Sequence, residues 1–306
     1  MPATIAPSAR QRVGQTAHLR PACDLTDIAR VFSRRSFRAL GAPRPEHVRE
    51  VARCLTSVAP EVHSMSLGEA FDFTLRIMAS QYRSEYVFKN WLVNRLVFGR
   101  HSPRTASALL ELRAGTSIAD VVVFNGTSAA YEIKTDLDNL SRLPLQLQNY
   151  SRYFDQVFVV TTTRMAPRIV GAVPPHVGVL VLTSRGSLSQ VRDATSDMNR
   201  LSAAALFGLL HRAEALRVLG RTCGYEVDVP VTRLWHRTRE MFEALPVEIA
   251  HREAVSELRA RGIARAPAAT LIPRSLRGLA YEVPLSGSAT HRMRVRLSMP
   301  TVALTM

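Results

Sequence analysis

Three short apolar runs near the middle of the chain constrain its fold most. They are ALLELRA (residues 108–114), IADVVVFN (118–125) and AAYEIKT (129–135), and they are rich in β-branched residues. GTS separates the first two runs, and NGTS separates the second from the third. Asn-Gly between two such runs is a strong signal for a tight hairpin. The pattern predicts three consecutive antiparallel strands.

Helical patterns flank these strands. Residues 67–98 carry apolar residues at helical spacing, with a break or bend near Ser80 and a stop at Gly99. After the third strand, Ser141 is a good N-cap for a helix whose apolar stripe is Leu143, Leu147, Tyr150 and Phe154. QVFVVTT (156–162) then reads as a buried strand. We therefore expect an α/β fold with the order helix, three antiparallel strands, helix, strand.

The rest of the chain divides into three expected regions. Residues 1–62 form a basic N-terminal extension, with helical patterns at 24–39 and 45–57. Residues 63–195 form the core, which continues with a short helix at 165–172 and strands at 177–183 and 188–193. Residues 196–306 are mainly helical and are a candidate nucleic-acid-binding region. Within them, AYEVPLS and HRMRVRLSM are candidate strands.

The charge of the chain points to a polyanionic partner. Forty basic residues against 25 acidic ones give a net charge of +15, which fits a nucleic acid. An arginine-rich genome is the alternative explanation, although it accounts for arginine over lysine and not for arginine over carboxylates. The three cysteines show no disulfide or metal spacing, and no apolar run is long enough to span a membrane. These features predict a cytoplasmic protein without membrane contact.

Lysine is rare in this chain: of the 40 lysine and arginine residues, only Lys89 and Lys134 are lysine. Lys134 lies two residues after Glu132 on the third predicted strand, so both side chains point to one face. The tight hairpin can place Asp120 beside Glu132. Two carboxylates and an ammonium would then meet in an apolar sheet, where Mg²⁺ or Mn²⁺ suits the oxygen ligands. The alternative is a cross-strand ion pair on a solvated face.

Asp120 followed by Glu132-Ile133-Lys134 after a hairpin resembles the PD-(D/E)XK motif of restriction-endonuclease-like nucleases. RSEYVFKNWL and the stretch from ADVVVFNG to FVVTT together resemble stand-alone bacterial proteins of that superfamily, most of them uncharacterised. The resemblance implies a restriction-endonuclease-like core. It also implies that Asp120, Glu132 and the carbonyl of Ile133 bind Mg²⁺ or Mn²⁺ and that Lys134 is the catalytic lysine.

Four further residues enter through the same resemblance. Glu85 on the first helix would complete the metal ligands, although it can instead pair with Lys89 four residues on. Glu111 competes with Glu85 for that role. Gln146 and Tyr150 match the Gln-x-x-x-Tyr element and would orient the site or touch the nucleic acid, while Tyr150 fits a core aromatic equally well. Ile118 departs from the family pattern, which often has a basic residue two before the first Asp.

The implied function is a metal-dependent nuclease that hydrolyses phosphodiester bonds, with DNA favoured over RNA. Defence against phage or plasmids, or DNA repair, is the role that the resemblance suggests. The main alternative is a catalytically silent nucleic-acid-binding or regulatory protein with the same fold. A homodimer or a partner subunit is compatible with either function.

Overall fold

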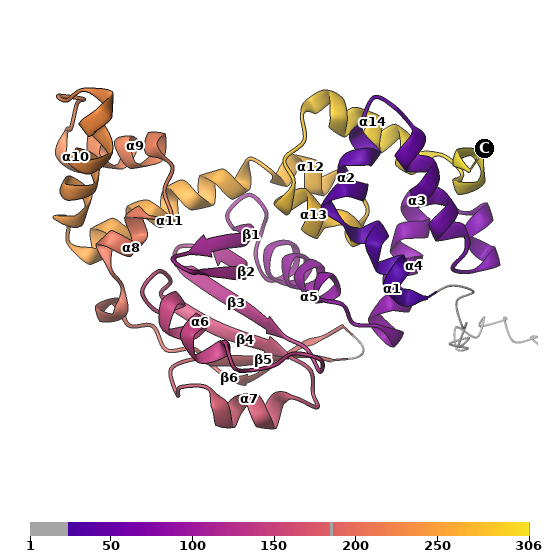
Figure 1. Cartoon of the computed structure of the whole chain (residues 1–306), viewed down its shortest axis with the longest axis horizontal. Coiled ribbons are helices and arrows are strands. Elements are labelled where there is room, and N and C mark those ends of the chain that lie inside the picture. The colour runs from indigo at the N-terminus through magenta and orange to yellow at the C-terminus, as the bar shows by residue number, and fades with distance from the viewer. Residues whose placement is uncertain (1–23, 184–185, 306) are drawn as a thin grey trace, which may run out of the picture.

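A six-stranded mixed sheet forms the centre of the computed structural model, which describes residues 24–183 and 186–305 (Figure 1). The strands follow one another in chain order: β1 (Ser107–Ala114), β2 (Ser117–Phe124), β3 (Ser128–Lys134), β4 (Gln156–Thr161), β5 (Gly178–Leu182) and β6 (Leu188–Arg192). The first three are antiparallel, β3, β4 and β5 are parallel, and β6 is antiparallel to β5. The predicted α/β class and the three antiparallel strands are confirmed.

The hairpin between β2 and β3 forms where NGTS predicted it. Gly126 takes φ +77°, a left-handed conformation that glycine adopts without steric cost. Every residue of β3 is buried, because the strand lies between β2 and β4 with helices on both faces of the sheet. The charged residues of β3 are therefore inside the protein, and a solvated face is excluded.

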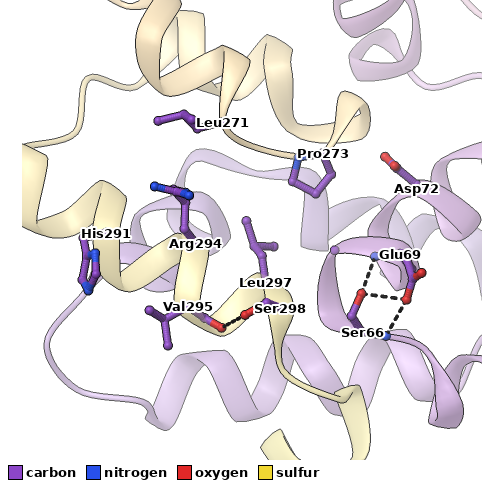
Figure 2. Close-up of a pocket in the computed structure, with 11 residues that line it drawn as sticks. Ser66, Glu69, Asp72, Leu271, Pro273, His291, Arg294, Val295, Leu297 and Ser298 are labelled. Atoms are coloured by element: carbon purple, nitrogen blue, oxygen red, sulfur yellow. Dashed lines mark hydrogen bonds between the residues drawn. The ribbon is translucent and has the colours of Figure 1, made fainter.

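Residues 67–98 form two successive helices, with the interruption close to Ser80, where a break or bend was expected. α4 (Leu67–Gln81) ends close to the predicted break, and α5 (Glu85–Leu92) continues into the π-helix η3 (Val93–Arg100). Ser66 and Glu69 form a capping box at the start of α4, with the Glu69 carboxylate accepting the Ser66 N–H at 2.9 Å (Figure 2). α5 packs on the sheet at β2 and β3 and on α13 (Arg277–Glu282). It thus connects the sheet to the C-terminal helices.

The opposite face of the sheet is covered by α6 (Leu143–Tyr150), α7 (Ala166–Ala172) and α11 (Val247–Ile263). The predicted N-cap at Ser141 is wrong, because Arg142 occupies that position. The Asn139 side chain accepts the Ser141 N–H at 2.8 Å, and this local turn delays the start of the helix. A separate lobe at the N-terminal end of α11 consists of α8 (Ala203–Phe207), α9 (Arg212–Cys223) and α10 (Val231–Glu243) (Figure 1).

Helices from the two ends of the described chain pack together. α2 (Arg34–Gly41) packs on α14 (Gly287–Ser298) and α13. α1 (Leu25–Ala29), α3 (Glu46–Thr56) and α12 (Ala266–Thr270) belong to the same lobe, where the indigo and yellow ribbons of Figure 1 meet. They share one apolar core with α4 and α5. Residues 1–23 of the predicted extension lie outside the described residues. No helix in the described part of the chain is long and apolar enough to cross a membrane.

The two candidate strands of the C-terminal region are helices instead. AYEVPLS lies in and after α13, and HRMRVRLSM belongs to α14. Met293, Val295 and Leu297 alternate with arginines, which mimics a strand. Only Met293 and Leu297 are buried, four residues apart on one side of α14, while Val295 is 49% exposed. Ser286 caps this helix by accepting the Ala289 N–H.

Arg296 connects α14 to the end of α2. Its guanidinium donates to the carbonyl oxygens of Ala39, Leu40 and Ala42 at 3.2, 3.0 and 2.7 Å. Arg296→Gln should lower the free energy of unfolding by about 2 kcal/mol, because these helix-terminal carbonyls lose a charged donor. Urea denaturation would measure the loss. Arg294→Gln, at an exposed position of the same helix, is the control; equal losses in the two variants would contradict the prediction.

Candidate active site

Asp120 lies at an interruption of the sheet. β1 and β2 pair on both sides of Glu111 and Asp120 but not at these two residues, and the β2–β3 ladder stops at Val121 and Tyr131. Beyond that point the Asp120 side chain replaces the ladder, since its Oδ2 accepts the Ile133 N–H at 2.7 Å. The register places Asp120 opposite Glu132. The expected juxtaposition of the two carboxylates is present.

Glu132 and Lys134 form a buried pair at the end of β3. Only 2% of Glu132 and 8% of Lys134 are exposed. The Lys134 Nζ donates to Glu132 Oε1 at 2.6 Å, and the Tyr150 hydroxyl lies 2.8 Å from Glu132 Oε2. Both oxygens of the carboxylate are thus held, one by an ammonium and one by a phenol. A buried charge needs such partners to be tolerated.

A second cluster joins the first at Asp120. Lys89 of α5 bonds to Glu85 on its own helix and to Glu111 on β1, and its Nζ lies 3.8 Å from Asp120 Oδ1. Glu85, Glu111 and Asp120 each offer an oxygen, and these atoms lie within 4.8 Å of one another. Within residues 24–183 and 186–305, no other trio of possible ligands meets this criterion. Both lysines of the chain therefore lie in one site.

Glu111 has an unusual backbone conformation. Its φ is +54°, and it is the sole residue other than glycine with a positive φ in the described part of the chain. A left-handed conformation costs about 1 to 2 kcal/mol for a residue with a Cβ. Here it interrupts the β1–β2 ladder and brings the Glu111 carboxylate to Lys89. Such conformations are concentrated at functional sites.

The electrostatics of the site shift two pKa values upwards. Burial, reinforced by the negative charge of Glu132, raises the pKa of Asp120 to about 7, although Lys89 opposes the shift. Burial, together with Glu132, also raises the pKa of Tyr150 well above its ordinary value, against a hydrogen bond from Gln146. Tyr150 therefore keeps its proton at neutral pH and remains a donor. Because Asp120 lies beside the negatively charged Glu132, a cation bound between them would lower the pKa of Asp120.

The structure brings all the predicted site residues together. Asp120, Glu132, Lys134, Glu85 and Tyr150 form the contacts given above, and Gln146 lies beside Tyr150, one turn earlier on α6. The Ile133 carbonyl points to the same strand edge as its N–H, which meets Asp120. Lys89 is a site residue that was not predicted, although the scarcity of lysine was a signal. Glu85 and Glu111 were alternatives for one role, and both lie in the cluster; the positive φ of Glu111 leaves no mark in the sequence.

Comparison with known proteins places this site in a phage protein family. Residues 78–264, more than half of the chain, match the family described as bacteriophage P4 protein cII. The chain belongs to this family. Protein cII of enterobacteria phage P4 is 29% identical over 105 residues, which cover 34% of this chain and 40% of that protein. The match thus spans about two fifths of that relative's length.

All the acidic and lysine residues of the site lie inside residues 78–264, the range that matches the protein cII family. The helices α1 to α3 and α12 to α14 lie outside it. Among solved structures, a Silicibacter pomeroyi protein of unknown function is 16% identical, covering 41% of this chain and 86% of that one. Its TM-score of 0.28 is too low to assign a shared fold.

Tyr150→Phe tests how strongly the hydroxyl supports Glu132. The substitution keeps the ring in the core and removes a hydroxyl that lies 2.8 Å from Glu132 Oε2 and 2.6 Å from the Ile118 carbonyl oxygen. We expect the free energy of unfolding to fall by about 2 kcal/mol, the cost of losing a hydrogen bond to a charged group. Urea denaturation is the measurement. Tyr153→Phe, at a half-exposed position on the next turn, should change stability by less than half that amount; the reverse order would disprove the role of Tyr150.

Proposed function

We propose that this chain is a divalent-cation-dependent nuclease of the PD-(D/E)XK class, with a restriction-endonuclease-like core, that acts on nucleic acid and on DNA in preference to RNA. One observation carries the proposal: Asp120, Glu132 and Lys134 meet where β2 and β3 separate, beside an acidic residue of the preceding helix. The buried Lys134 is not explained by surface ion pairing, because burying an ammonium is costly. A reaction that uses this ammonium accounts for the cost.

The donor atoms at the site fit a hard divalent cation. Carboxylate and carbonyl oxygens are the ligands that Mg²⁺ and Mn²⁺ prefer. Asp120 would hold the ion with Glu132, the Ile133 carbonyl and either Glu85 or Glu111. Lys89 at present supplies the positive charge to Glu85, Glu111 and Asp120, so its ammonium would have to withdraw. A cation bound there would neutralise phosphate charge and acidify a water molecule.

The residues of the chain have separate tasks in this proposal. Lys134 places an ammonium next to the scissile phosphate, where it can orient the attacking water and stabilise negative charge on the phosphate oxygens. Glu132 positions that ammonium through the 2.6 Å contact to Oε1. Tyr150 fixes Glu132 by its hydroxyl, and Gln146 supports Tyr150. The chain has more basic than acidic residues, and this net positive charge attracts the polyanion.

The test is cleavage of a panel of substrates by the purified full chain. Supercoiled plasmid, linear duplex, single-stranded DNA and RNA are incubated with Mg²⁺, with Mn²⁺ or with EDTA. We expect cleavage of DNA that requires the metal, and the substrate that disappears first identifies the strand preference. Binding to the panel without cleavage under every condition would reject the nuclease. That result would favour a nucleic-acid-binding protein that retains the fold.

A further inference from the structure

A polar cavity of about 650 Å³ lies on another side of α5 from the acidic site. We name it the arginine groove, and the residues used below are Arg76, Trp91, Asn94, Arg95, Arg274 and Arg277. Glu85 and Lys89 lie on the sheet side of α5, whereas Asn90 lies on the other side and accepts the Gly278 N–H at 2.9 Å. One helix therefore positions both the acidic site and the groove.

The charges of the groove do not balance. Four arginines line it against a single carboxylate, Asp72, which already accepts the Ser275 N–H at 2.9 Å. Within the described residues, none of the four guanidinium groups forms an ion pair. Elsewhere the chain pairs its arginines readily, as Arg217 does with Glu257 and Arg261 with Glu214. An excess of unpaired cations lining a cavity favours an anionic ligand.

Polar atoms in the wall of the groove also lack partners. Ser275 is 2% exposed, and its Oγ finds no hydrogen-bond partner among the described residues; nor does the buried Nε of Arg277. The Arg277 guanidinium is fixed in place, since it stacks over the Phe98 ring at 4.1 Å and donates to Asn94 Oδ1 at 3.0 Å. Burial and the neighbouring Arg274 lower the pKa of Arg277. The negative charge of a bound anion would relieve this repulsion between the two arginines.

An aromatic wall stands next to the cations. Trp91 is half-buried and lines the groove, one residue after Asn90. Asn94, Arg95 and Phe98 belong to the π-helix η3, a rare geometry that often occurs at functional sites. In proteins that bind nucleic acid, bases stack on aromatic side chains such as tryptophan, and neighbouring arginines neutralise the phosphates.

We propose that the arginine groove binds a nucleotide unit, its phosphate held by Arg76, Arg274 and Arg277 and its base placed against Trp91. The ligand is either a free nucleotide or one unit of a nucleic-acid strand. The inference goes beyond the proposed cleavage reaction and does not depend on it. A hollow at the start of α4 is a useful contrast (Figure 2): there two carboxylates, Glu69 and Asp72, face a single arginine, Arg294, so it gives no preference for an anion.

The experiment uses Trp91 as the reporter. The full chain carries two tryptophans, so Trp235→Phe leaves Trp91 as the single emitter. This protein is titrated in EDTA, where no cleavage can occur, with adenosine monophosphate, adenosine, inorganic phosphate and a short oligothymidine. Arg274→Gln and Arg76→Gln remove exposed groove cations. Arg168→Gln on α7 removes an equally exposed charge outside the groove and is the matched control.

We expect adenosine monophosphate or the oligonucleotide to quench Trp91, with binding about tenfold weaker in either groove variant and less than twofold weaker in Arg168→Gln. Quenching by the free nucleotide identifies that source, and quenching by the oligonucleotide alone identifies a strand. No quenching by either ligand, equal effects of the groove and control variants, or equal binding of adenosine and its monophosphate would each overturn the proposal. Thermal melting of every variant verifies that it is folded.

Discussion

Lys134→Met should lower the rate of DNA cleavage by about 1,000-fold while nucleic-acid binding changes little. The substitution keeps an unbranched side chain of similar length in a position that is 8% exposed. It removes the ammonium that the proposed reaction uses, and groups of this kind contribute about 100- to 10,000-fold to a rate. Single-turnover cleavage and fluorescence anisotropy on the same substrate measure the two quantities separately.

Lys134→Arg is the sharper variant, because it retains the charge. A guanidinium is a wide planar fork, and the buried contact at 2.6 Å from Glu132 Oε1 has the dimensions of an ammonium. We expect Lys134→Arg to be nearly as inactive as Lys134→Met. Wild-type rates in Lys134→Arg would mean that charge alone suffices, and wild-type rates in Lys134→Met would remove Lys134 from the reaction. Melting temperatures of both variants show whether Glu132 tolerates the change.

Asp120→Asn should weaken Mn²⁺ binding by more than about 100-fold, which is the second large effect. Asp120 is the residue shared by both carboxylate clusters, and loss even of a supporting contact around a metal costs about 10- to 100-fold in affinity. The asparagine keeps the size of the side chain and can still accept the Ile133 N–H. Isothermal titration of the metal-free protein with Mn²⁺ is the measurement.

Lys89→Met is expected to change the same affinity in the opposite direction. Its ammonium now compensates Glu85 and Glu111, and without it the carboxylates repel one another until a cation enters. Mn²⁺ should bind about tenfold more tightly to this variant. If Lys89→Met bound the metal more weakly than the wild type, Lys89 would be a support of the site and not a competitor for it. If Asp120→Asn bound normally, the cation would have to lie elsewhere.

The sequence predicted the central part of the fold because local signals there agree. The Asn-Gly turn, the β-branched runs and the tight spacing fix the register of β2 and β3, and the register alone puts Asp120 opposite Glu132. Tyr150 lies on an apolar stripe that also orients its hydroxyl toward Glu132. Contacts between adjacent strands and the following helix join residues that are close in the chain, so local sequence patterns can predict them.

Other features depend on contacts that no local pattern encodes. The left-handed φ of Glu111 is imposed by the surrounding sheet, so the sequence showed an ordinary strand residue. Arg277 belongs to the arginine groove through Phe98 and Asn94, which are far away in the chain. The alternation of Met293, Val295 and Leu297 suggested a strand, and the packing of α14 on α2 overrides it. Tertiary contacts of this kind decide between local possibilities of similar energy.

The packing of α2 on α14 has a consequence for biosynthesis. The hydrogen bond from Arg292 to Gly41 joins residues that are 251 positions apart. At a translation rate of about 5 to 20 residues per second, α2 waits roughly 10 to 50 s for its partner. During that time Phe37 and Leu40, which the finished protein buries, have no complete core to enter. The nascent chain therefore leaves these apolar side chains without their final partner until α14 has been synthesised.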